Sequence, residues 1–88
     1  MNDTAEKEIG RISHWFGHLG VAVIDIETGT LSIGDTIHIK GHTTDSTLTI
    51  EAMQLDGEDV ESASKGTSVG IKVPDRARRT DHVYKVDA

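Results

Sequence analysis

Residues Leu31 to Val73 read LSIGDTIHIKGHTTDSTLTIEAMQLDGEDVESASKGTSVGIKV, with apolar side chains at every second position in several short runs. Ile37 and Ile39 alternate with polar residues directly after a Gly-Asp pair, and VGIKV at 69–73 repeats the alternation. Alternation of this kind is typical of β-strands that bury one face. The stretch therefore predicts short antiparallel strands joined by turns.

The apolar pattern changes phase once inside this stretch. Leu48, Ile50 and Ala52 share one parity, whereas Met53 and Leu55 have the other. A one-residue slip turns every later side chain to the opposite face of a strand. We therefore expect a β-bulge near Ala52-Met53, which would also bend the strand.

The flanking sequence extends the same pattern. Candidate strands cover 9–16, 21–26 and 82–86, and 60–65 could form a helical turn, a short strand or an irregular corner. Six or seven strands in 88 residues predict an all-β domain, a small closed antiparallel β-barrel. We expect residues 1–8 to be a flexible lead-in and residues 9–88 to form the single barrel domain.

Composition narrows the class of protein. The chain has no cysteine, which excludes disulfides and thiolate chemistry. Its longest apolar run, at 21–24, is far shorter than the ~20 residues of a membrane helix. With no visible targeting segment, we expect a cytoplasmic protein that does not engage the membrane.

Charge is distributed unevenly. The net charge is −6, which argues against strong sequence-independent binding to nucleic acid. Residues 45–61 hold six acids and no Lys or Arg, whereas residues 72–85 hold five bases and two acids. The chain therefore has an acidic middle and a basic end.

Several loose motifs occur together in a particular order. They are Gly17-x-x-Gly20 followed by VAV, the run 31–37, Gly41, the run 49–53 and the run 63–70. In this order they resemble the second domain of the translational GTPases, the β-barrel of elongation factor Tu and of single-domain elongation-factor-like proteins. The resemblance covers roughly 9–86. Similar barrels also occur in initiation factor 2 and at the C-terminus of some U32-type peptidases, so the fold does not determine the function.

The chain departs from the translation factors at functional positions. It has no GxxxxGK[ST] motif, so we expect no GTP binding. Ala52 stands where elongation factor Tu has a glutamate against the terminal adenosine of tRNA, and residues 23–26 replace a Thr-Gly-Arg-Val-like segment. The resemblance therefore implies the barrel without the GTPase and supports no carried-over tRNA contact.

The basic end contains the best candidate binding residues. Arg76, Arg78 and Arg79, with Lys85, would contact phosphates if the chain binds RNA. The alternative is a solvated loop whose arginines pair with neighbouring acids. Trp15 would be a stacking platform for a base if exposed, or would plug one end of the barrel if buried.

The other polar groups do not form a recognisable catalytic set. Five histidines are spread over the chain, and metal sites need three or four convergent ligands. The acids at 56–59 lie in a polar turn, and the hydroxyls at 43–46 have no positioned base. We therefore expect surface histidines, no metal, no cofactor and no enzymatic activity.

The combined prediction is a stand-alone, non-catalytic translation-factor-like module. Its partner would be tRNA, ribosomal RNA or a translation protein. The alternative, favoured by the acidic net charge, is a protein–protein adaptor with no nucleic-acid role.

Overall fold

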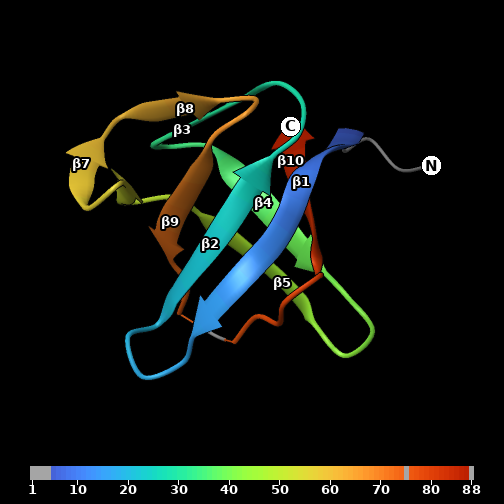
Figure 1. Cartoon of the computed structure of the whole chain (residues 1–88). Helices are drawn as coiled ribbons and strands as arrows, with labels where there is room; N and C mark the ends of the chain where they lie inside the picture. The colour runs from blue at the N-terminus through green and yellow to red at the C-terminus, as the bar shows by residue number, and fades with distance from the viewer. Residues whose placement is uncertain (1–4, 75, 88) are drawn as a thin grey trace.

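The computed structural model describes residues 5–74 and 76–87, and this part of the chain is all β. Eight strands form one antiparallel sheet, and β3 and β8 form a second, two-stranded sheet (Figure 1). The strands are β1 (Ala5–Phe16), β2 (Val21–Ile26), β3 (Thr30–Ser32), β4 (Thr36–Lys40), β5 (Asp45–Thr49), β6 (Met53–Leu55), β7 (Glu58–Val60), β8 (Ser62–Ser64), β9 (Ser68–Lys72) and β10 (His82–Asp87). The predicted all-β antiparallel class is confirmed.

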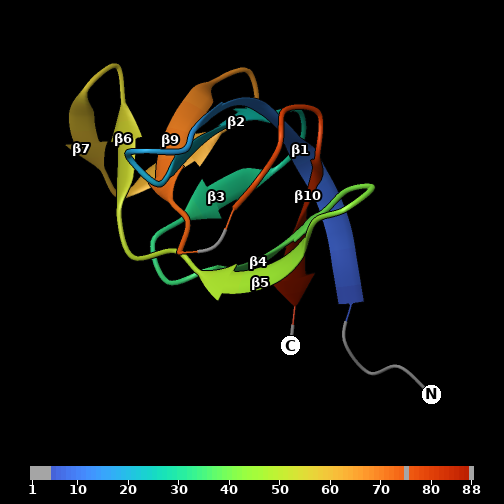
Figure 2. The same cartoon turned by 90° about the horizontal axis from the view of Figure 1, so that it is seen from below.

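The large sheet has the strand order β5-β4-β10-β1-β2-β9-β6-β7. Its strands curve around a common interior, as the view from below shows (Figure 2). Among the residues described, β5 pairs only with β4 and β7 only with β6, so the large sheet ends at these two strands. No closed barrel is therefore found in the described residues, which form ten strands where six or seven were predicted.

Aliphatic side chains fill the interior. In β2, Ala22, Ile24 and Ile26 are buried while the residues between them are half-buried or exposed. β-Branched side chains suit such a core because they pack well on a pleated surface. The buried hydrophobic residues are Ile9, Ile12, Ala22, Ile24, Ile26, Leu31, Ile37, Ile39, Ile50, Met53, Ala63, Val69, Ile71, Val73, Ala77 and Val83.

The phase change near residue 52 has a different cause from the predicted bulge. The strand ends at Thr49, and the chain crosses to another part of the large sheet, where β6 begins at Met53. Ile50 and Met53 are both buried because each belongs to a different segment with its own register. A break between strands therefore replaces the bulge.

The register shifts lie instead in β1, between Glu8 and Gly10 and between Ile12 and His14. At Gly10 the chain passes so close to β2 that an added Cβ would lie 1.9 Å from the carbonyl oxygen of Asp25. Glycine is needed here because no side chain fits, and the shifts let one long strand pair with both β10 and β2.

For two other segments, the structure corrects one expectation from the sequence and decides between two alternatives for the other. β1 begins at Ala5, inside the predicted lead-in, because residues 5–8 pair with β10; the first four residues lie outside the part described. Residues 60–65 contain the end of β7 and all of β8, so the short-strand alternative is confirmed over the helical turn.

Candidate functional site

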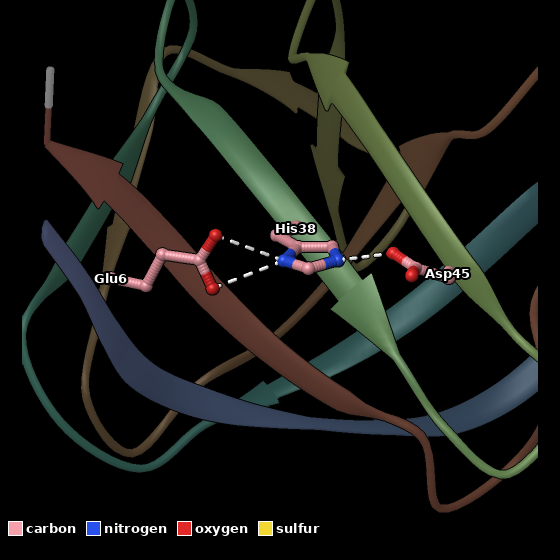
Figure 3. Close-up of polar contacts among 3 residues, drawn as sticks. All are labelled: Glu6, His38 and Asp45. Atoms are coloured by element: carbon pink, nitrogen blue, oxygen red, sulfur yellow. Dashed lines mark hydrogen bonds and ion pairs between the residues drawn. The ribbon is translucent and has the colours of Figure 1, made fainter. Parts of the chain in front are cut away.

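A histidine held between two carboxylates lies on the outer face of the sheet (Figure 3). His38, on β4, places Nδ1 3.0 Å from both carboxylate oxygens of Glu6 on β1, and Nε2 2.5 Å from Oδ1 of Asp45 on β5. β10 runs between β4 and β1 in the sheet. One imidazole therefore connects strands on both sides of its own.

The two carboxylates determine the charge of this imidazole. Hydrogen bonds that His38 donates to Asp45 and, with a smaller effect, to Glu6 raise the pKa of His38, against a smaller opposing effect of burial. A histidine that donates from both ring nitrogens is protonated and has no free nitrogen to act as a base. The cluster of Glu6, His38 and Asp45, the His38 strap, therefore connects strands through an imidazole whose two nitrogens both face carboxylates, an arrangement unsuited to general-base catalysis.

A second histidine–carboxylate pair continues the same face. His82 Nδ1 contacts Glu8 Oε2, and the ring of Tyr84 lies 6.4 Å from His82 and 6.3 Å from His38 between ring centroids. These residues come from β1, β4 and β10, which are neighbours in the sheet. The outer face of these strands is therefore polar, with Tyr84 between the two histidines.

Three of the predicted basic residues belong to one loop. Arg76, Arg78 and Arg79 are all exposed in the segment between β9 and β10. The backbone of this segment is anchored by buried Asp81, whose Oδ2 accepts the N–H of Arg78 at 2.8 Å. The fixed feature of the loop is its backbone, and contact of these arginines with RNA or a partner stays a prediction.

The other two predicted residues are engaged with the protein itself. Lys85 Nζ lies 3.3 Å from Oδ2 of Asp35 and donates to the Thr30 carbonyl at 3.2 Å. Trp15 is half-buried and packs against the core, and its role as a stacking platform stays a prediction. Its neighbour Phe16 is 41% exposed and stacks on His14.

A hollow of about 630 Å³ lies beside β5. Thr47, Leu48 and Thr49 form one wall, and residues 72–74 with Gly20 form the other. Its lining is predominantly apolar. Such a hollow is large enough for side chains of a bound peptide, since ligand pockets span roughly 300–1,000 Å³.

Residues 5–74 and 76–87 include all five histidines of the chain. No group of three or more His, Asp or Glu side chains in this part of the chain has an arrangement that could hold a metal ion. Ser13 Oγ is 3.5 Å from Nδ1 of its neighbour His14, the outer limit of a hydrogen bond, and is 3.3 Å from the Val23 carbonyl that it donates to. No helix long and apolar enough to cross a membrane occurs in the described residues.

Sequence reasoning missed the His38 strap and the hollow beside β5. Glu6 and His38 are 32 positions apart, and Glu6 lay in the predicted lead-in. Only Asp45, seven positions from His38 across a hairpin, was near enough to suggest a pairing. The hollow depends on Gly20, Leu48 and Val73 meeting, which needs the strand order of the whole sheet.

Two curated relatives are proteases. The chain is 38% identical over 80 residues to a protein of Porphyromonas gingivalis named collagenase, and 41% identical over 78 residues to an uncharacterized protease of Methanocaldococcus jannaschii. These matches cover 90% and 88% of this chain but 22% and 19% of the relatives, so the chain spans about a fifth of their length. No protein-family model matches the chain.

The fold comparison agrees with the sequence matches. The crystal structure of the C-terminal domain of a putative U32 peptidase from Geobacillus thermoleovorans superposes with a TM-score of 0.83, covering 90% of this chain and 91% of that domain. Its selenomethionine variant gives a TM-score of 0.81. At 18% identity these similarities establish a shared fold.

The predicted relationship to the translational GTPases is wrong, and so is the predicted role in protein synthesis. The relatives found are proteases, and the superposed structures are U32 peptidase domains. The motifs behind the prediction are turn glycines and alternating apolar residues, which build the fold. Such residues recur wherever this architecture is used, so they do not distinguish one family of proteins from another.

Proposed function

We propose that this chain is a non-catalytic accessory domain that binds polypeptide for a peptidase of the U32 type. The observation that carries the proposal is the extent of the match: nearly the whole chain corresponds to about a fifth of two proteases. A region of this size is a domain within those proteins. The superposed Geobacillus thermoleovorans domain, which occupies the C-terminal part of a putative peptidase, supports the same assignment.

The geometry of the polar groups supports a binding role over a catalytic one. His38 has both ring nitrogens committed to carboxylates, so it cannot take a proton from a nucleophile while the strap is formed. Ser13 directs its hydroxyl to a backbone carbonyl. The hollow beside β5 is lined mainly by apolar groups and threonines, with Glu51 and Lys72 at its border, and such a lining is suited to holding a chain segment.

The proposal is tested with the purified 88-residue chain. It is incubated with fluorescent gelatin and fluorescent denatured casein, and separately passed over both polypeptides immobilised on resin. We expect retention on resin without release of fluorescent fragments. Hydrolysis that copurifies with the chain through successive columns, or passage through both resins without retention, would contradict the proposal.

A further inference from the structure

The two edge strands of the large sheet differ in how well they are protected from pairing with another chain. β7 is three residues long and begins with two acids, Glu58 and Asp59, so it is a short and charged edge. β5 is five residues long, reads DSTLT and pairs with β4 in unbroken register. Natural edge strands avoid pairing with other chains through shortness, charge, proline or bulges. Apart from Asp45 at its start, β5 has none of these.

The backbone of β5 presents hydrogen-bonding groups outward. Directly after β5, Ile50 donates its N–H to the Asp35 carbonyl at 2.9 Å. Bonded and non-bonded pairs alternate along an antiparallel ladder, so Leu48 bonds to β4 while the N–H and C=O groups of Thr47 and Thr49 point away from it. In the part of the chain that the structure describes, no strand lies on that outer side of β5.

The hollow of about 630 Å³ lies along the same strand. It is bordered by Thr47, Leu48 and Thr49 of β5, by Val73 and Pro74, and by the charged residues Glu51 and Lys72. A segment that paired with β5 would therefore place alternate side chains over a predominantly apolar depression. The depression fits small apolar or β-branched side chains, and the outward backbone groups fit an extended main chain.

We propose that β5 is the site at which this domain captures an extended polypeptide, which adds to the sheet as a further strand and places alternate side chains in the adjoining hollow. This inference rests on the proposed polypeptide-binding function and locates it. β-Strand addition obtains affinity from main-chain hydrogen bonds and specificity from pockets for alternate side chains. An extended peptide supplies both, whereas a compact ligand would leave the outward groups of Thr47 and Thr49 unpaired.

Amide hydrogen exchange on the whole chain tests the site. The probe is a capped five-residue peptide in which threonine and valine alternate, and its control has proline in place of valine. We expect the Thr47 and Thr49 amides to exchange quickly in the free protein and more slowly with the first peptide at millimolar concentration. The Leu48 amide, already bonded to β4, and the amides of β7 should not respond.

A substitution separates the backbone from the side chain. Thr47→Pro removes one outward backbone N–H and leaves the ladder with β4 intact. Thr47→Val keeps that backbone N–H and has a side chain of similar shape to threonine. Loss of one hydrogen bond should weaken peptide binding about threefold to tenfold in Thr47→Pro relative to Thr47→Val. If Thr47→Pro does not fold, the exchange measurement on the unaltered chain decides alone.

Three results would overturn the inference. They are protection of the β7 amides in place of β5, equal protection by the proline control peptide, and protection of Thr47 and Thr49 that rises with protein concentration in the absence of peptide. The last result would mean that two copies of the chain pair through β5. Retention on gelatin or casein resin with unchanged exchange at Thr47 and Thr49 would reject this site and leave the proposed function standing.

Discussion

His38 shows how one side chain can connect elements that are distant in sequence. Its two nitrogens reach Glu6 and Asp45, on strands that lie on opposite sides of β4 in the sheet. The side chain of His38 is only 14% exposed, while that of Asp45 is 75% exposed. The strap therefore depends on an imidazole that is well shielded and on a carboxylate that is largely in solvent, so its contribution to stability should be modest.

The strap predicts a pH dependence of stability. Because Asp45 and Glu6 raise the folded-state pKa of His38 above the ordinary value of about 6.5, the protonated imidazole stabilises the folded state. This contribution is present below about pH 6.5 and is lost as the pH rises through the raised pKa. We expect His38→Gln to lower the free energy of unfolding by on the order of 1 kcal/mol at pH 6 and by less at pH 9, as measured by urea denaturation.

The control for this prediction is His42→Gln, at an exposed histidine in the β4–β5 hairpin. The other charged and titratable groups near His38 on this face, among them Lys40, Glu8, His82 and Tyr84, are unchanged in both variants. If His38→Gln lowers the free energy of unfolding equally at pH 6 and pH 9, the imidazole stabilises the fold by packing and not by its charge.

Gly10 gives a prediction about close packing. A Cβ at this position would overlap the backbone of Asp25, which cannot move without disturbing the β1–β2 pairing. We expect Gly10→Ala to destabilise the fold by about 2–4 kcal/mol. Gly17→Ala is the matched control, because its Cβ would meet only the indole of Trp15 at 3.4 Å. Thermal unfolding of both variants checks the prediction, and similar melting temperatures would refute it.

Among the strands, the alternation of apolar and polar residues predicts some features of the structure and leaves others undetermined. Strands such as β2 and β9 could be predicted from their own residues, because each buries every second side chain. The break between β5 and β6 could not be predicted in this way, since a bulged strand and two strands with independent registers both give the same phase change in the sequence. Which of the two occurs depends on the partner strands, β4 for β5 and β9 for β6.

Residues 76–81, between β9 and β10, belong to no strand, so a side chain that fixes their backbone can be tested by substitution. Asp81 is buried and accepts the Arg78 N–H, which would otherwise lose its partner. We expect Asp81→Ala to cost about 1–3 kcal/mol of unfolding free energy. Asp81→Asn keeps an acceptor oxygen and should cost less. Equal losses in urea denaturation of the two variants would show that the charge, and not the hydrogen bond, anchors the segment.

At the scale of the whole molecule, alternation and turn residues were enough to predict an antiparallel all-β domain. They could not predict the strand order, and the candidate site depends on that order. Leu48 and Val73 face the same hollow only because the sheet curves until β5 approaches the end of β9. The family was misassigned for a related reason: the residues that suggested translation factors shape the fold and carry no chemistry.

Under the proposed function, this chain binds polypeptide for a protease whose catalytic residues lie outside the matched region. Its most direct test is the gelatin hydrolysis of the Porphyromonas gingivalis relative in three forms: intact, with the matched region deleted, and with that region replaced by this chain. We predict that deletion raises KM with little change in kcat, and that replacement by this chain restores KM. The proposed function would be contradicted by a deletion that abolishes kcat in a protein that remains folded. It would also be contradicted by a replacement whose KM stays as high as that of the deletion.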